Sequence, residues 1–208
     1  MIEIIPIFAI PLMVDHIGHL ITDDVVQYTK DLEYEPVHIG NGDWSNSKAV
    51  LDHEAFADIK KVICNNVKKL AKDVYLIDDD IEFHYGRSWT LKHSYGHHCV
   101  MHNHTGSIFS GVLYIDASEN SGDIVFHNAS AMGCSHSYHQ ISLPLTHTKF
   151  NAYNTPHYTV PSVTGTLLIF SSGLSHSVKP NLSNRDRYSL SFNVFPKGMI
   201  GMKELILS

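Results

Sequence analysis

The sequence predicts a mainly β protein in which a helical region precedes a β core within one domain. Three observations support this expectation. The chain has 208 residues, 43% of them hydrophobic and 17% charged, which suits one domain of ordinary size and excludes a largely disordered chain. Residues 1–80 contain helical patterns, whereas residues 81–201 consist of short runs rich in Val, Ile, Tyr, Phe and Thr. Gly, Asn, Ser and Pro separate these runs, as turn residues separate strands.

The helical region begins with an apolar segment, Ile2–Ile10, which we expect to form a buried strand. It lacks the basic start and the small-residue cleavage site of a signal peptide. A short helix is expected near Thr22–Leu32. Between residues 52 and 74 apolar side chains recur at helical spacing while the lysines mostly avoid that stripe, so we expect an amphipathic helix with one buried face. Residues 1–80 therefore act as a support region for the β core.

The β core is expected to contain many short strands, which is typical of a sandwich, a jelly roll or a related barrel. The expected strands are Glu82–Leu91, Val100–His104, Ser110–Asp116, Asp123–His127, Thr159–Pro161, Gly165–Ser171 and Arg187–Val194. The segment Asn128–Pro156 is polar and rich in Ser and His. We expect it to be a surface excursion or a lid over a site.

Charge and cysteine content exclude several classes of function. The net charge of −6 has the wrong sign for a protein that holds nucleic acid mainly by charge. No run of 18 uncharged apolar residues occurs, so no transmembrane helix is expected. The three cysteines, Cys64, Cys99 and Cys134, form no CxxC pair, which favours a reducing, cytoplasmic setting over a disulfide scaffold. The 16 histidines direct attention to metal chemistry.

The pattern His102-Asn103-His104 follows one of the expected strands. In a strand, residues i and i+2 point to the same face about 7 Å apart, so both imidazoles can reach one metal ion. His176 comes at the end of the apolar run that begins at Gly165, and a third ligand from a distant strand is what a metal site in a β protein needs. Three imidazole nitrogens suit Fe, Zn, Cu or Ni better than Mg or Ca.

A second polar pattern, Arg187-Tyr188-Ser189, lies on the last expected strand. Alternation places the guanidinium of Arg187 and the hydroxyl of Ser189 side by side. This pair suits a carboxylate held through two hydrogen bonds, as in the binding of a diacid. Arg185 is a rival for this role, but we prefer Arg187 because alternation places it on the same face as Ser189, with Ser191 and Asn193 following on that face.

Together these motifs resemble the small 2-oxoglutarate and Fe(II)-dependent oxygenases of bacteria and phages. The resemblance covers roughly residues 80–201, with the motifs in the same order, and the helical region is similar only in its general pattern of residue types. The matching stretches are Arg87-Ser-Trp-Thr90, His102-Asn-His104-Thr-Gly-Ser107, Ser110-Gly-Val-Leu-Tyr-Ile115, Leu168-Ile-Phe-Ser-Ser-Gly-Leu-Ser-His176-Ser-Val178 and Arg187-Tyr-Ser-Leu-Ser-Phe-Asn-Val-Phe-Pro-Lys-Gly198.

The resemblance implies a double-stranded β-helix, a cupin-like jelly roll with helices packed on one sheet. It implies a single oxygenase domain over residues 1–208, with Fe(II), 2-oxoglutarate as cosubstrate and O2. In such an enzyme His102 and His176 bind the metal, Arg187 binds the distal carboxylate of 2-oxoglutarate, and Ser189 and Tyr114 assist. The reaction is the oxidative decarboxylation of 2-oxoglutarate to succinate, coupled to hydroxylation of a C–H bond in a small-molecule or peptide substrate.

One position departs from the wider superfamily, which usually has a carboxylate where this chain has His104. Either the site is a three-histidine site with His102, His104 and His176, which we favour, or a carboxylate such as Asp116 or Asp123 completes it. The spacing does not decide between them. The expected location is the cytoplasm of a bacterial or phage-infected cell, and the oligomeric state is left open, a homodimer included.

Two other functions use the same residues. Gly96 followed by His102-x-His104 resembles half of a cupin signature, which predicts a metalloenzyme that works without 2-oxoglutarate. The cupin pattern requires a glutamate four or five residues after the second histidine, where this chain has Ile108 and Phe109, so we place it second. A non-catalytic jelly-roll binding module would position the histidines without a metal.

Overall fold

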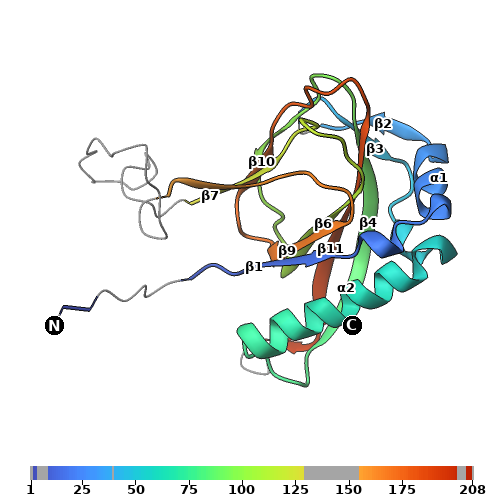
Figure 1. Ribbon diagram of the computed structural model, residues 1–208. Coiled ribbons are helices and arrows are strands. Elements are labelled where there is room, and N and C mark those ends of the chain that lie inside the picture. Colours follow the sequence, from blue (N-terminus) through green and yellow to red (C-terminus); the bar gives the residue numbers. More distant parts are fainter. Residues whose placement is uncertain (1, 4–8, 39, 129–154, 201–204, 208) are drawn as a thin grey trace.

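Two antiparallel β-sheets make up the core of the protein (Figure 1). The computed structural model describes residues 2–3, 9–38, 40–128, 155–200 and 205–207. The larger sheet has the strand order β1-β9-β6-β11-β4-β3-β2, with β12 paired to β11, and the smaller sheet has the order β5-β10-β7-β8. The strands are β1 (Leu12–His16), β2 (Tyr34–Pro36), β3 (Asp43–Ser45), β4 (Glu82–His93), β5 (Cys99–His102), β6 (Phe109–Asp116), β7 (Ile124–His127), β8 (His157–Val160), β9 (Thr166–Ser171), β10 (His176–Val178), β11 (Arg187–Ile200) and β12 (Leu205–Leu207).

The alternation of side chains along β6 and β9 divides the interior into two layers. Leu113 and Ile115 point to one face of the larger sheet, where they join an apolar cluster with the helices. Tyr114, Leu168 and Phe170 point to the other face, where they pack against Ile124 and Phe126 of the smaller sheet. The expected mainly β fold, a jelly roll of the double-stranded β-helix kind, is confirmed.

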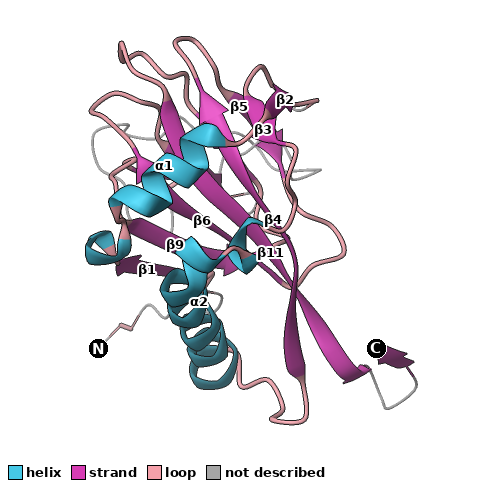
Figure 2. Ribbon diagram, turned by 90° about the vertical axis from the view of Figure 1, so that its right-hand side faces the viewer, coloured by secondary structure: helices cyan, strands magenta, loops and turns pink. Residues whose placement is uncertain are grey.

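Two helices cover the outer face of the larger sheet (Figure 2). In α1 (Asp23–Asp31), Thr22 caps the amino end by accepting a hydrogen bond from the backbone N–H of Val25. In α2 (Ala57–Lys69), Ile59, Ile63 and Val67 recur every four residues and are fully buried against the sheet. This helix continues into a π-helical turn at Leu70–Val74. Both expected helices are therefore confirmed, as is their packing on one sheet.

The start of the chain differs from the expectation. The strand lies at Leu12–His16, where it pairs with β9, and the described ends of the expected strand Ile2–Ile10 are not in a strand. Residues 4–8 lie outside the described residues. The strand begins directly after Pro11, whose missing N–H cannot take part in a ladder. The region before residue 80 also contributes β2 and β3, strands of three residues each, which extend the larger sheet beyond β4 so that β2 forms its edge.

Within the described ranges, no helix is long and apolar enough to span a bilayer. Of the segment expected to be a surface excursion or lid, residues 129–154 lie outside the described residues, and so does Cys134. Cys64 is not part of a disulfide.

Candidate active site

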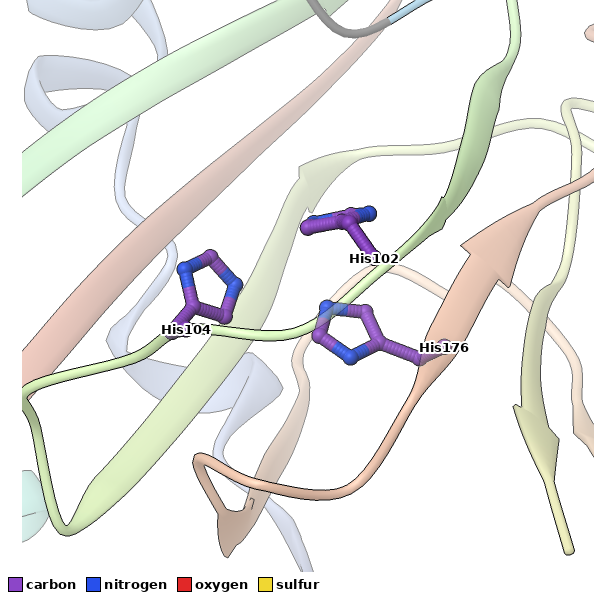
Figure 3. A group of neighbouring side chains, drawn as sticks. All are labelled: His102, His104 and His176. Carbon is purple, nitrogen blue, oxygen red and sulfur yellow. The ribbon is translucent and has the colours of Figure 1, made fainter. Parts of the chain in front are cut away.

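Three histidines converge on one point, two of them on paired strands of the smaller sheet and one in the loop that follows (Figure 3). His102 is the last residue of β5 and pairs with His176, the first residue of β10. His104 follows two residues later, beyond the end of the strand, and its backbone N–H donates to the carbonyl of Ser172 (2.9 Å). One ring nitrogen from each histidine lies within 4.8 Å of the other two. In the part of the chain that the structure describes, no other cluster of His, Cys, Asp or Glu has this geometry.

Backbone carbonyls fix the orientation of two of the three rings. The Nδ1 atom of His102 lies 2.8 Å from the carbonyl oxygen of Val100, and that of His176 lies 2.9 Å from the carbonyl oxygen of Leu174. A ring nitrogen this close to a carbonyl carries the hydrogen, which leaves the lone pair on Nε2. Burial, together with the neighbouring histidines, lowers the pKa of His176 to about 3 and that of His104 to about 4. Both rings are therefore neutral and able to bind a metal.

A cavity of about 330 Å³ opens beside the histidines and reaches the larger sheet. Alternate residues of β4, β6 and β11 line it, because cross-strand partners such as Ser189 and Tyr114 point to the same face. Apolar side chains make up much of the wall. No described residue that lines the cavity is acidic, although the chain as a whole has a net charge of −6.

Arg187 lies in the wall of this cavity with only 2% of its surface exposed. Its Nη1 donates to the carbonyls of Ser121 (3.2 Å) and Gly122. Its Nη2 lies 2.6 Å from Nδ1 of His93. Burial, and then the charge of Arg187, lower the pKa of His93 to about 2, so this imidazole is neutral and accepts the hydrogen bond.

The remaining edge of the Arg187 guanidinium has no hydrogen-bond partner among the described residues. Its Nε is buried and has no hydrogen bond, and no carboxylate in the described ranges forms an ion pair with it. A buried cation without a direct ion-pair partner is costly unless an anion is supplied from outside the chain. The free edge of Arg187 is therefore suited to an anionic ligand.

Tyr114 and Ser189 lie next to this arginine. The Cζ atom of Arg187 is 5.8 Å from the centre of the Tyr114 ring, and Ser189 is paired with Tyr114 across β11 and β6. Burial raises the pKa of Tyr114 to about 12, so its hydroxyl stays protonated. The structure thus brings His102, His104, His176, Arg187, Ser189 and Tyr114 to the wall of one cavity.

The alternative residues lie elsewhere. Asp116 forms ion pairs with Lys30 (2.7 Å) and Arg185 (3.2 Å). Asp123 forms an ion pair with Lys179 (3.2 Å). Neither carboxylate belongs to the histidine cluster or lines the cavity, and the rival Arg185 is an exposed side chain. The geometry therefore favours the three-histidine arrangement.

Comparison with known proteins agrees with this site. Residues 87–193, half of the chain, match the sequence model of a family described as "Putative 2OG-Fe(II) oxygenase", where 2OG denotes 2-oxoglutarate. The chain belongs to this family. The resemblance found in the sequence is confirmed, whereas an origin in bacteria or phages stays a prediction. No curated protein matches the chain by sequence.

Solved structures of other oxygenases share the fold of this family member. A prolyl-4-hydroxylase from Pseudomonas putida aligns with a TM-score of 0.60 at 15% identity, over 89% of this chain and 93% of that chain. HygX from Streptomyces hygroscopicus, with nickel and 2-oxoglutarate bound, aligns with a TM-score of 0.60 at 10% identity, over 90% and 83%. A prolyl hydroxylase from Trichoplax adhaerens, in complex with a peptide of hypoxia-inducible factor, aligns with a TM-score of 0.59 at 12% identity, over 88% and 83%. At these identities the likeness shows the fold.

As a 2-oxoglutarate/Fe(II) oxygenase, the protein uses Fe(II), 2-oxoglutarate and O2, and the residues present fit these groups. Three neutral imidazole nitrogens are suitable donors for Fe(II). The free edge of Arg187 suits one carboxylate of 2-oxoglutarate. Because no described residue of the cavity wall is acidic, a bound Fe(II) ion and Arg187 would both remain available to anionic ligands.

The sequence did not assign a role to several residues that line the oxygenase cavity, among them Trp44, Arg87 and His93. Trp44 lies on β3, a strand of three residues for which the sequence carries no clear pattern. Arg87, Trp89, Leu91 and His93 alternate along β4 and share one face. That alternation is a usable signal, but β4 runs two residues beyond the expected end at Leu91, so His93 fell outside the expected strand.

Proposed function

We propose that this oxygenase hydroxylates a C–H bond of a small-molecule or peptide substrate, coupled to conversion of 2-oxoglutarate to succinate. In this proposal His102, His104 and His176 hold Fe(II), while Arg187, assisted by Ser189 and Tyr114, holds the distal carboxylate of 2-oxoglutarate. The observation that carries it is the meeting of three imidazoles and a buried arginine without an acidic partner in one cavity. When bound, iron and 2-oxoglutarate supply the oxygen chemistry, which side chains alone do not perform.

The histidines contribute orientation and charge. Val100 and Leu174 hold the rings of His102 and His176 through their carbonyls, so little rotation is lost when a metal binds. A set of three neutral ligands leaves the site one unit more positive than two histidines with a carboxylate. This extra charge favours an anionic cosubstrate.

The arginine contributes position. Ser121, Gly122 and His93 together occupy hydrogens on both terminal nitrogens of Arg187, which prevents the guanidinium from turning. Because the group is buried, its attraction for a carboxylate is stronger than it would be in water. The protonated Tyr114 hydroxyl beside it adds no negative charge to the pocket. The apolar walls exclude water from the reacting groups.

The test is succinate formation by protein made without a histidine tag, stripped of metal and reloaded with Fe(II) under anaerobic conditions. We expect succinate only when Fe(II), 2-oxoglutarate and O2 are all present. His102→Ala and His176→Ala are expected to lose bound metal, whereas His19→Ala, at an exposed position outside the cavity, is the matched control. Unchanged metal content in the first two variants would contradict the ligand assignment.

The same assay separates the other two functions. A cupin-like metalloenzyme would bind metal but form no succinate from 2-oxoglutarate. A binding module without catalysis would lose no metal upon substitution of these histidines, because it would hold none.

A further inference from the structure

Arg87 lies at the open end of the cavity, and its surroundings differ from those of the other two arginines of the chain, Arg185 and Arg187. Arg185 forms an ion pair with Asp116, and Arg187 is buried and fixed by hydrogen bonds. Arg87 lines the cavity, is exposed, and has neither a hydrogen bond nor an ion pair within the described residues. Its hydrogen-bond donors are therefore available to a ligand in the cavity.

Two aromatic rings hold Arg87 in place. Its Cζ atom lies 5.6 Å from the centre of the Trp44 ring and 5.7 Å from that of the Trp89 ring. Contact with aromatic faces positions a guanidinium without using its N–H groups, which stay free for an anion. Lys48, 3.8 Å above the Trp44 ring, adds a second positive charge at this end.

Trp89 connects this cation to the metal site. The centre of its ring lies 6.2 Å from that of His104, and Arg87 lies over the same ring system. A ligand of moderate size can therefore contact Arg87 with one end and reach the histidine cluster with the other. The cavity wall also includes Leu91, Val112 and Phe170, which suit an apolar body.

The balance of charge also favours an anion. The histidines are neutral ligands, so Fe(II), Arg187 and Arg87 together carry more positive charge than the two carboxylates of 2-oxoglutarate neutralise. No described lining residue supplies the difference. Glu35, an acid near this end, accepts a hydrogen bond from Nε1 of Trp44 (2.9 Å), lies 4.0 Å from Lys48, and does not line the cavity.

From these observations we infer that the primary substrate carries an oxyanion, a carboxylate or a phosphate, on an apolar body, and that Arg87 binds this oxyanion. The inference rests on the proposed function, because it places the substrate in the cavity beside the metal ligands. It names a class of substrate and a residue that determines specificity.

The chain has two tryptophans, and both line this cavity, so tryptophan fluorescence reports directly on its occupancy. The probes are 3-phenylpropanoate, phenyl phosphate and the neutral 3-phenylpropanamide. Each is titrated into protein loaded with Zn(II) and saturating 2-oxoglutarate, which fills the Arg187 end and permits no turnover. Because Arg87 is exposed, we expect the anions to bind about fivefold more tightly than the amide. The preferred anion identifies carboxylate or phosphate as the group recognised.

Arg87→Gln is expected to abolish the preference for anions, whereas Arg185→Gln, which changes an exposed arginine outside the cavity, is expected to retain it. Equal affinity for anion and amide, a preference that survives in Arg87→Gln, or no fluorescence change with either anion would overturn the inference. Binding of Zn(II) and 2-oxoglutarate is measured separately by calorimetry. Failure of that binding, with the Arg87-dependent preference intact, would refute the proposed function and leave the anion site standing.

Discussion

Replacing His93 with glutamine is expected to flatten the dependence of stability on pH. In the native protein burial, followed by the charge of Arg187, lowers the pKa of His93 from 6.5 to about 2, so the ring stays neutral throughout that interval. In the unfolded chain the same ring takes up a proton as the pH falls through 6.5. The unfolded state therefore binds more protons, and the free energy of unfolding decreases with falling pH between about 6.5 and about 2.

The size of this effect follows from a single proton. For one histidine that titrates only in the unfolded state, the loss of stability is about 1.4 kcal/mol between pH 7.5 and pH 5.5. His104 and His176 add losses of the same sign, but they are present in both proteins. Glutamine cannot take up the proton, yet its amide oxygen can still accept the hydrogen bond from Nη2 of Arg187.

The measurement is urea unfolding of metal-free protein in the presence of a chelator, at pH 7.5 and pH 5.5, for the wild type and His93→Gln. The wild type should lose about 1.4 kcal/mol more than the variant over this interval. His19→Gln, an exposed substitution, should retain the loss seen in the wild type. If the wild type and His93→Gln lose the same stability, His93 does not remain neutral beside Arg187.

Three further predictions concern the cavity and its support. Arg187→Met removes a buried cation that has no direct ion pair among the described residues. Calorimetry should show that this variant binds 2-oxoglutarate about a hundredfold or more weakly than the wild type. Urea unfolding should show that the ligand-free variant is at least as stable as the wild type. His104→Asp adds a negative charge to the site and should retain Zn(II) but weaken 2-oxoglutarate binding by at least about tenfold, and unchanged affinity would show that His104 lies away from the metal. Gly122→Ala should be less stable than Gly96→Ala by about 1–3 kcal/mol in urea unfolding. Both glycines have a positive φ, so the backbone strain is shared. Only at Gly122 would the new methyl group lie 2.3 Å from the carbonyl oxygen of Lys179, whereas the space around Gly96 is open. Equal stability of the two alanine variants would contradict the tight packing around Gly122.

Patterns within single strands made much of the site predictable. The two-residue period of a strand places Arg187 on the same face as Ser189, and no tertiary information is needed to see it. The helix over residues 52–74 was equally accessible, because its apolar stripe is local. His102 and His104 are also close in sequence, although the strand ends at His102 and the turn after it, rather than a shared strand face, brings the second ring near.

Contacts between distant segments were not predictable in the same way. The pairing of His176 with His102 depends on β10, a strand of three residues that carries no recognisable period. The role of His93 depends on its position opposite Arg187 in the β4–β11 ladder. The sequence also could not show that Asp116 forms ion pairs with Lys30 and Arg185. The spacing of residues had left Asp116 as a possible metal ligand, and these ion pairs argue against that role.

The distribution of charge connects stability with function in this protein. The acidic residues that give the chain its negative net charge do not line the described cavity wall. This wall contains arginines and no acidic residue, so its charge is opposite in sign to the net charge of the chain. Arg187 is buried without a direct ion pair in the described ranges, which costs stability until an anion binds. Any ligand that binds only the native state stabilises it in proportion to its affinity, so 2-oxoglutarate should raise the midpoint of thermal unfolding. Arg187→Met removes the buried charge and also the group that binds the anion. 2-Oxoglutarate should therefore raise the thermal midpoint of this variant very little, which would link the buried charge directly to cosubstrate binding.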